Sequence, residues 1–262
     1  MIRAAIFDVD GTLVPYGGTI LSDRLRADLL ELRRRGVLLF LATGRGKHDL
    51  DNTGMLRDVP FDAYLTFTGL RCYDHDGVYR NVTIAREDLE NGCRVLREHP
   101  ELVAAIETDE GNFLNQVNER VEELFSRDIH TPIYPVAPPE RFLEGNVYQF
   151  VVIIPRGEEK LFLSVMPHCT YARWHPQAID IIPKGDGKAD GIRATLERYG
   201  LRREEVIAFG DGENDISMLK LAGLGVAMGS AEESVRAAAD YVTASVGEEG
   251  VSAALRRFGL LD

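Results

Sequence analysis

Short apolar runs alternate with amphipathic helical patterns in the first and last thirds of the chain. The apolar runs have the length of strands, and the helical patterns repeat leucine or isoleucine along one face. The expected strands are residues 2–9, 37–42, 63–66, 206–209, 225–228 and 241–243, and the expected helices are 22–35, 47–56, 189–199, 215–222, 232–239 and 250–258. Such alternation is typical of a parallel sheet covered on both faces, so we expect an α/β fold with a Rossmann-like core.

The middle of the chain has a different pattern. It contains helical patterns and alternating strands around an irregular, proline-containing stretch. The expected helices are 86–98 and 118–125, and the expected strands are 103–108, 147–154 and 169–174. This mixture indicates an inserted α+β cap domain with an antiparallel sheet. We place the core at residues 1–81 and 183–262 and the cap at 82–182.

Composition narrows the class of protein. The 262 residues carry 42 acidic and 30 basic side chains, a formal net charge of −12. This charge repels nucleic acid and anionic membrane, so we expect neither as a partner. The cysteines Cys72, Cys93 and Cys169 are far apart in sequence, which favours reduced thiols. No signal peptide or membrane-length apolar run is evident, and we expect a cytoplasmic protein.

Polar side chains gather at the ends of the expected strands. The first strand ends in Asp8 and Asp10, and the segment 43–45 follows the second. Lys188 precedes a helix, and the segment 210–215 follows a strand in the last third. The carboxyl ends of parallel strands meet at one edge of a sheet, where ligands bind near the switch in strand order. Four separate segments therefore deliver polar groups to one place.

The residue types in these segments suggest a reaction. Crowded carboxylates raise one another's pKa values, and a divalent cation relieves the repulsion. Oxygen ligands without a nearby histidine or cysteine favour Mg²⁺ over zinc. A lysine and a threonine hydroxyl beside a glycine-rich turn suit phosphate oxygens. Together these groups fit phosphoryl transfer, in which catalysis depends on positioning and charge neutralisation.

Four motifs resemble, in order and spacing, those of the haloacid dehalogenase (HAD) superfamily. They are Asp8-Val9-Asp10-Gly11-Thr12, Thr43-Gly44-Arg45, Lys188, and Gly210-Asp211-Gly212-Glu213-Asn214-Asp215. The last motif, followed by Ile216-Ser217-Met218-Leu219, and the insert after the third strand resemble the Cof-type branch with a C2 cap of the C2B kind. The resemblance implies a phosphatase.

The resemblance also implies catalytic roles. Asp8 attacks phosphorus and becomes an aspartyl-phosphate. Asp10 protonates the leaving oxygen and then activates water. Thr43 and Lys188 hold phosphoryl oxygens, helped by backbone N–H groups near Asp10 and Gly44.

Further residues are implied in binding. Mg²⁺ is expected on Asp8, the main-chain carbonyl of Asp10 and Asp211, with Asp215 contributing directly or through water. Thr68-Gly69 stands where the family usually has Asn-Gly facing the substrate. The residues expected to bind phosphate or substrate are Gly11, Thr12, Thr43, Gly44, Arg45, Thr68 and Asn214.

Several of these residues also fit a second role. Lys184 competes with Lys188, although the Pro-Lys-Gly spacing favours Lys188. Arg45 fits either a substrate contact or a structural ion pair. Asp215 also fits the N-cap of the helix that follows. We interpret Asp49 as a solvated loop residue.

The expected function is Mg²⁺-dependent hydrolysis of a phosphate monoester on a small metabolite, a sugar phosphate first among them. A phosphomutase acting on a sugar phosphate is the alternative enzyme, because it uses the same Asp8 and Asp10. A non-catalytic sensor of phosphorylated metabolites is a third reading, although it predicts loss of a catalytic group and none is missing.

Overall fold

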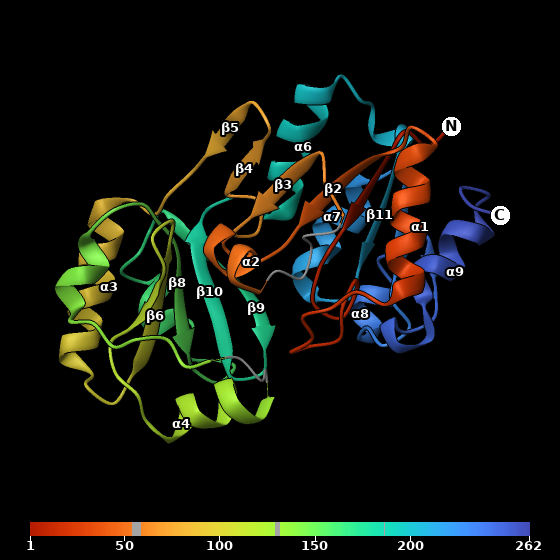
Figure 1. Cartoon of the computed structure of the whole chain (residues 1–262). Coiled ribbons are helices and arrows are strands. Elements are labelled where there is room, and N and C mark those ends of the chain that lie inside the picture. The colour runs from red at the N-terminus through yellow and green to blue at the C-terminus, as the bar shows by residue number, and fades with distance from the viewer. Residues whose placement is uncertain (54–58, 129–131, 186) are drawn as a thin grey trace. The chain divides into compact units, whose positions relative to one another are not determined.

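A computed structural model describes residues 1–53, 59–128, 132–185 and 187–262. It divides into two compact units (Figure 1). The core unit comprises Met1–Arg45, Leu50–Asn81 and Asp186–Asp262, and the insert unit comprises Gly46–Asp49 and Val82–Gly185. The expected fold class is confirmed, because a largely parallel sheet forms the core and an α+β segment is inserted in it.

The core sheet has eight strands in the order β13-β12-β11-β1-β2-β3-β4-β5. The six strands from β13 to β3 pair in parallel, whereas β4 and β5 add an antiparallel hairpin. The strands are β1 (Ala4–Phe7), β2 (Leu38–Ala42), β3 (Ala63–Thr66), β4 (Arg71–Asp74), β5 (Gly77–Asn81), β11 (Val206–Gly210), β12 (Leu224–Ala227) and β13 (Tyr241–Val242). The chain runs outward from β1 on one side and from β11 on the other, so the strand order switches between these two neighbours.

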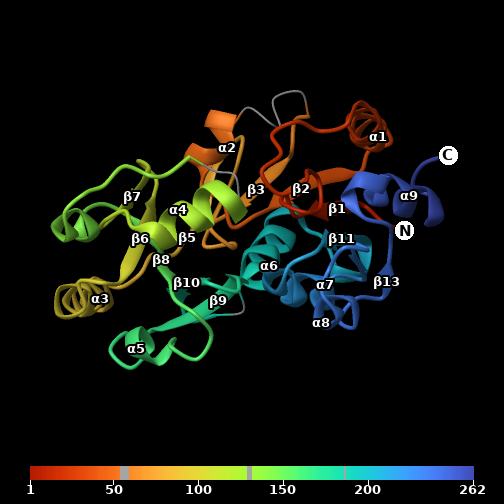
Figure 2. The ribbon, with the colours of Figure 1, turned by 90° about the horizontal axis from the view of Figure 1, so that it is seen from below.

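Helices cover both faces of the core sheet (Figure 2). Helices α1 (Asp23–Arg34) and α9 (Gly250–Arg257) pack on one face, where Leu25, Leu29 and Leu255 are buried against β1 and β2. The opposite face is covered by α6 (Lys188–Tyr199), α7 (Ile216–Leu221) and α8 (Glu233–Arg236). Shorter elements are α2 (Lys47–Thr53), η3 (Arg203–Glu205), η4 (Glu213–Asp215) and η5 (Val246–Glu248).

The local signals in the core are largely confirmed. Ser22 caps α1 by accepting the Leu25 N–H at 3.0 Å, as its side-chain oxygen predicts. Helix α2 ends at Thr53, and residues 54–56 of its expected range lie outside the described residues. The Asp76-Gly77 pair, a typical turn sequence, joins β4 and β5 into an antiparallel hairpin.

The insert unit contains a five-stranded antiparallel sheet in the order β7-β6-β8-β10-β9. Its strands are β6 (Val103–Thr108), β7 (Asn112–Leu114), β8 (Val147–Ile153), β9 (Cys169–His175) and β10 (Ala178–Pro183). Its helices are α3 (Arg86–Glu98), α4 (Glu119–Glu122), η1 (Glu123–Asp128), η2 (Pro139–Leu143) and α5 (Lys160–Leu163). One sheet face packs against α3 and α5, and the other packs against α4 and η1.

Two insert strands were not predicted from the sequence. Strand β7 is only three residues long, and β10 carries Asp180 in the middle of an otherwise apolar run. The helix expected at 118–125 begins as α4 and continues as the π-helical turn η1. Short strands and interrupted helices give weak periodicity, which explains both differences.

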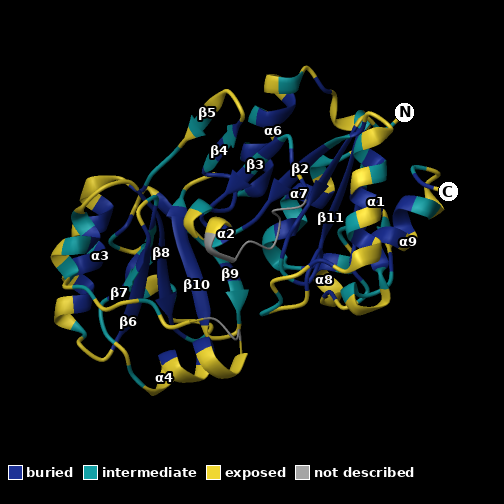
Figure 3. Cartoon of the chain, in the orientation of Figure 1, coloured by how far each residue is buried: buried dark blue, intermediate teal, exposed yellow. Residues whose placement is uncertain are grey.

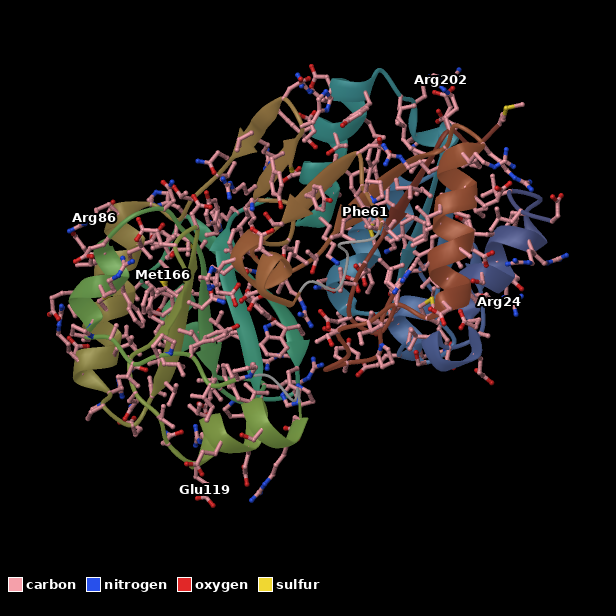
Figure 4. The ribbon with its side chains drawn as sticks, viewed as in Figure 1. Arg24, Phe61, Arg86, Glu119, Met166 and Arg202 are labelled. Carbon is pink, nitrogen blue, oxygen red and sulfur yellow. The ribbon has the colours of Figure 1, made fainter. Side chains whose placement is uncertain are left out.

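Burial follows these layers, with buried strands and exposed outer helix faces in each unit (Figure 3). Phe61 and Met166 lie in the interiors of their units, whereas Glu119 and Arg202 are exposed (Figure 4). The three cysteines are free and buried. Among the helices of the described residues, none has the length and apolar character needed to cross a membrane.

Candidate active site

Asp8 stands at the centre of the core sheet edge, directly after β1. The preceding Phe7 is in register with Phe209 of β11 and Leu41 of β2. The rings of Phe7 and Phe209 stack with centroids 5.2 Å apart, and the Asp8 N–H donates to the Phe209 carbonyl at 3.0 Å. Paired strands on both sides therefore fix the backbone of Asp8 at the switch in strand order.

Lys188, the first residue of α6, joins two carboxylates at this edge. Its Nζ donates to Asp8 Oδ1 at 2.6 Å, to Asp215 Oδ1 at 2.6 Å and to the Ala42 carbonyl at 2.9 Å. All three ammonium hydrogens thus have acceptors, although the side chain is fully buried. Lys184 is exposed and belongs to the insert unit. The structure therefore brings Lys188, rather than Lys184, to Asp8.

Burial and crowding shift the pKa values of these groups. Burial raises the pKa of Asp8, and the carboxylates of Asp215 and Asp211 add to the shift while Lys188 opposes it. Burial and Asp215 raise the pKa of Asp211 to about 7. Burial by itself would lower the pKa of Lys188, but the neighbouring Asp215 and Asp8 outweigh it and raise that pKa. Lys188 is therefore a permanent cation in a site with excess negative charge.

Asp211 lies opposite Asp8, in the loop after β11. Its Oδ1 accepts the Thr12 hydroxyl at 3.4 Å, and its Oδ2 accepts the Tyr16 hydroxyl at 3.1 Å. Gly11 adopts a φ of +79°, and a Cβ at this position would lie 2.0 Å from Asp211 Oδ2. Gly11 is therefore required both by its own conformation and by the close approach of Asp211.

Asp215 organises the same loop. Its Oδ1 accepts from Lys188, while its Oδ2 accepts the N–H groups of Asp211 at 2.9 Å and Gly212 at 3.0 Å. A Cβ on Gly210 would lie 2.5 Å from the Asp215 side chain, so this approach also depends on a glycine. Asp215 occupies the N-cap position of α7, as one interpretation of the sequence allowed, but its side chain makes no cap hydrogen bond to that helix. Its oxygens are used by the loop and by Lys188 instead.

The loops after β2 and β3 meet beside this cluster. The Thr68 N–H donates to the Thr43 carbonyl at 2.9 Å, and a Cβ on Gly44 would lie 3.8 Å from Thr68 Oγ1. Phe67 and Thr68 both have left-handed conformations, with φ of 51° and 57°. Non-glycine residues with such angles cost free energy and concentrate at functional loops. Thr43, Gly44 and Thr68 are thus brought together by a strained, buried turn.

Arg45 contacts Asp10 through both arms of a guanidinium fork. Its Nε donates to Asp10 Oδ2 at 2.8 Å, and its Nη2 donates to Asp10 Oδ1 at 2.6 Å. Of the two interpretations of Arg45 from the sequence, the structure shows the ion pair.

Three other expected binding residues contribute differently. The Gly11 N–H donates to the Val14 carbonyl at 2.7 Å, and the Thr12 N–H donates to the Val9 carbonyl at 3.3 Å. These hydrogen bonds shape the loop and occupy the groups expected to hold phosphate. Asn214 lies in η4, half-buried between Asp211 and Asp215 in the chain.

Tyr16 is a site residue that the sequence did not indicate. Its side chain is 54% exposed, yet its hydroxyl reaches Asp211, which is 195 positions away in the sequence. Burial of the hydroxyl end, together with the carboxylates of Asp211, Asp8 and Asp215, raises the pKa of Tyr16, so the hydroxyl remains a donor although the rest of the residue is exposed. The segment Pro15-Tyr16-Gly17-Gly18 reads as an ordinary turn.

Asp49 corrects another expectation. It lies in α2 and accepts two contacts from the Asn112 side-chain amide, at 3.2 and 3.0 Å. It is therefore a structural acceptor within the insert unit instead of a solvated loop residue.

The donor set fits Mg²⁺. Carboxylate oxygens of Asp8, Asp211 and Asp215 lie within 4.8 Å of one another. Four carboxylates, those three and Asp10, face the two cations Lys188 and Arg45, which leaves two unbalanced negative charges. A divalent cation would balance them, and hard oxygen donors are its preferred ligands. Both Asp215 oxygens accept from nitrogen donors, whereas the two Asp211 oxygens accept from the longer and weaker hydroxyl contacts of Thr12 and Tyr16, which a cation would displace more easily.

The sequence matches the model of the haloacid dehalogenase-like hydrolase family over residues 5–255. A Bacillus subtilis protein named "Putative phosphatase YkrA" is 30% identical over 269 residues, which is 99% of this chain and 98% of that one. The solved structure of BT1666, a HAD superfamily phosphatase from Bacteroides thetaiotaomicron, superposes with a TM-score of 0.90 at 33% identity and covers 100% of this chain and 96% of that one. BT4131, described as a HAD subclass IIB sugar phosphatase, superposes with a TM-score of 0.87 at 34% identity over 99% of this chain and all of that one. The chain therefore belongs to the haloacid dehalogenase-like hydrolase family, and it is a phosphatase.

Proposed function

We propose that this phosphatase hydrolyses a phosphate monoester of a small metabolite through an aspartyl-phosphate on Asp8, with Mg²⁺ as cofactor. The observation that carries the proposal is the Lys188 ammonium held between Asp8 and Asp215 at the switch in strand order. It combines a fixed nucleophile with a permanent cation for phosphoryl oxygens, which is the arrangement phosphoryl transfer requires.

In the first step, a carboxylate oxygen of Asp8 bonds to phosphorus and the ester P–O bond breaks. Asp10 gives its proton to the leaving oxygen, so the product is an alcohol. Thr43 retains its own hydroxyl proton for a phosphoryl oxygen, because its Oγ1 serves as acceptor for the Arg45 N–H at 3.1 Å. The backbone beside Gly44 completes the cradle, and Lys188, whose three N–H groups already have acceptors, stabilises the phosphoryl group through its positive charge.

In the second step, water attacks phosphorus and the bond from phosphorus to Asp8 breaks. Asp10 accepts the water proton, which restores both aspartates and releases inorganic phosphate. Asp215 holds Lys188 and the Asp211 loop in place throughout.

Asp8, Asp211 and the main-chain carbonyl of Asp10 would hold Mg²⁺, and Asp215 would contribute its charge. When bound, Mg²⁺ neutralises charge on the transferring phosphoryl group. The substrate class we favour is a sugar phosphate, supported by the likeness over nearly the whole chain to the sugar phosphatase BT4131.

The test is phosphate release from a panel of phosphorylated metabolites, with Mg²⁺ or excess EDTA. Asp8→Asn should lower turnover by at least about 10⁴-fold and abolish trapping of a phosphoryl-enzyme. Asp28→Asn is the matched control, because Asp28 is also buried but pairs with Arg256 in the core. It should retain turnover. Full activity in EDTA, or wild-type turnover by Asp8→Asn, would contradict the proposal.

A further inference from the structure

Two hydrogen bonds fix the backbone of Arg45. Its N–H donates to Thr43 Oγ1 at 3.1 Å, and its carbonyl accepts the Phe67 N–H at 3.2 Å. Phe67 is itself buried in a left-handed conformation. The turn after β2 and the strained turn after β3 therefore hold the root of the Arg45 side chain from two sides.

The guanidinium of Arg45 then fixes the plane of the Asp10 carboxyl. Two parallel contacts, at 2.8 and 2.6 Å, join Nε and Nη2 to the two carboxyl oxygens. The two side chains are 21% and 25% exposed, so solvent screens the pair and its contribution to stability is modest. A bidentate fork supplies geometric specificity, because rotating the carboxyl breaks at least one contact.

We propose that Arg45 is a positioning residue for Asp10, which aims the acid–base carboxyl at the leaving oxygen and then at the attacking water. This inference rests on the proposed function. The fork reaches both carboxyl oxygens of Asp10, so one oxygen can turn to the reacting atoms while the other stays on Arg45 and keeps the carboxyl plane.

A consequence follows for the choice of ester. While Asp8 bonds to phosphorus, the P–O bond of the ester breaks. An alkoxide leaving group must then take the Asp10 proton. A p-nitrophenolate leaves readily without that proton. Loss of correct aim by Asp10 should therefore slow alkyl esters more than p-nitrophenyl phosphate, whereas loss of a phosphate contact should slow both equally.

The experiment compares kcat/KM of wild type, Arg45→Lys and Arg45→Gln on p-nitrophenyl phosphate and on the best alkyl phosphate of the panel. General acid catalysis contributes about 10²- to 10⁴-fold. Arg45→Gln should therefore lower kcat/KM on the alkyl ester about 10- to 100-fold more than on the aryl ester. Arg45→Lys should fall between, because a point cation lacks the fork. The Ki of inorganic phosphate should change by less than about 3-fold, well under the tenfold that 1.4 kcal/mol of lost binding would produce.

Two controls isolate the pair. Arg33→Gln removes another partly exposed ion pair of the core unit, the one between Arg33 and Asp62. It should leave kcat/KM on both esters unchanged. When Asp10 is already replaced by Asn, adding Arg45→Gln should lower kcat/KM by less than about 3-fold further, because the effects of two residues that act together are not additive.

Equal losses on both esters, a large rise in the Ki of phosphate, or additive effects with Asp10→Asn would overturn the role of Arg45. That result leaves the proposed function intact as long as Asp8→Asn abolishes turnover of both esters. If Asp8→Asn keeps wild-type turnover, the proposed function fails instead, and with it the role given to Asp10.

Discussion

Each unit buries an aspartate in or directly after a strand of its sheet, but the two aspartates accept hydrogen bonds from different kinds of donor. In the core unit, Asp8 accepts from the buried ammonium of Lys188. In the insert unit, Asp180 of β10 accepts the Trp174 indole N–H at 2.6 Å and the Gln149 amide at 2.9 Å. The side-chain donor to the core acid is a cation, whereas the two side-chain donors to the insert acid are neutral.

This difference separates a permanent charge from a titratable one. Burial raises the pKa of Asp180 to about 7, although the Trp174 hydrogen bond lowers it somewhat. The neighbouring Asp215 and Asp8 raise the pKa of Lys188, so it stays an ammonium over the range in which Asp180 changes. We infer that the core cluster depends on an ion pair for its stability and that the insert cluster depends on pH.

The largest expected effect on stability comes from removing the Lys188 cation of the core cluster. Lys188→Met leaves Asp8 and Asp215 buried without their cation, and losing one partner of a buried ion pair costs about 3–5 kcal/mol. Urea unfolding in EDTA should show this loss. Circular dichroism is the appropriate signal, because the single tryptophan lies in the insert. Lys184→Met is the control, because that lysine is exposed, and equal losses for the two variants would contradict the comparison.

The second effect comes from the insert half. Asp180 in the folded protein holds a proton that the unfolded chain loses above about pH 4. The folded state then binds more protons between about pH 4 and 7, so stability falls as pH rises through this window and is level above it. The loss from Asp180 should reach up to about 4 kcal/mol. Asp180→Asn should remove this share of the slope, and the share that remains comes from Asp211 and Asp8, whose pKa values burial also raises.

Fluorescence of the single tryptophan provides the measurement. Trp174 donates directly to Asp180, so its emission in the folded protein should change around pH 7 in wild type and not in Asp180→Asn. His175 is the neighbouring titratable group, with ring centroids 6.0 Å apart, and burial lowers its pKa. His175→Gln should keep the transition. If His175→Gln removes it instead, Asp180 is not its source.

The smallest expected effect comes from Gly11, which tests the close approach of Asp211 in the core cluster. Gly11→Ala and Gly36→Ala both place a side chain at a left-handed φ, +79° and +82°. Each should lose about 1–2 kcal/mol from this strain. Only at Gly11 would the new Cβ meet Asp211, whereas nothing lies within 4 Å at Gly36. Gly11→Ala should therefore also lose activity, about 10- to 100-fold, since small misplacements of site groups have effects of this size. Equal activity of the two variants would show that the contact is unimportant.

The sequence predicted the meeting of the four polar segments because strand periodicity and the parallel topology rule place strand ends together. Arg45 and Tyr16 were harder to assign, because their partners depend on side-chain direction across the site. Strand β10 was missed because Asp180 interrupts its apolar pattern, and that aspartate is tolerated only through donors on neighbouring strands. Local patterns thus predict elements, whereas the partner of a buried charge depends on packing between distant segments.

The assignment of Gly46–Asp49 to the insert unit has a consequence for modularity. The chain passes between the units four times instead of twice, and Asp49 is the acceptor for the Asn112 amide of β7. A transplant of residues 82–185 into another protein would therefore leave this partner behind. Exchange of the insert as one continuous block would therefore separate Asn112 from Asp49 and leave its amide without this acceptor.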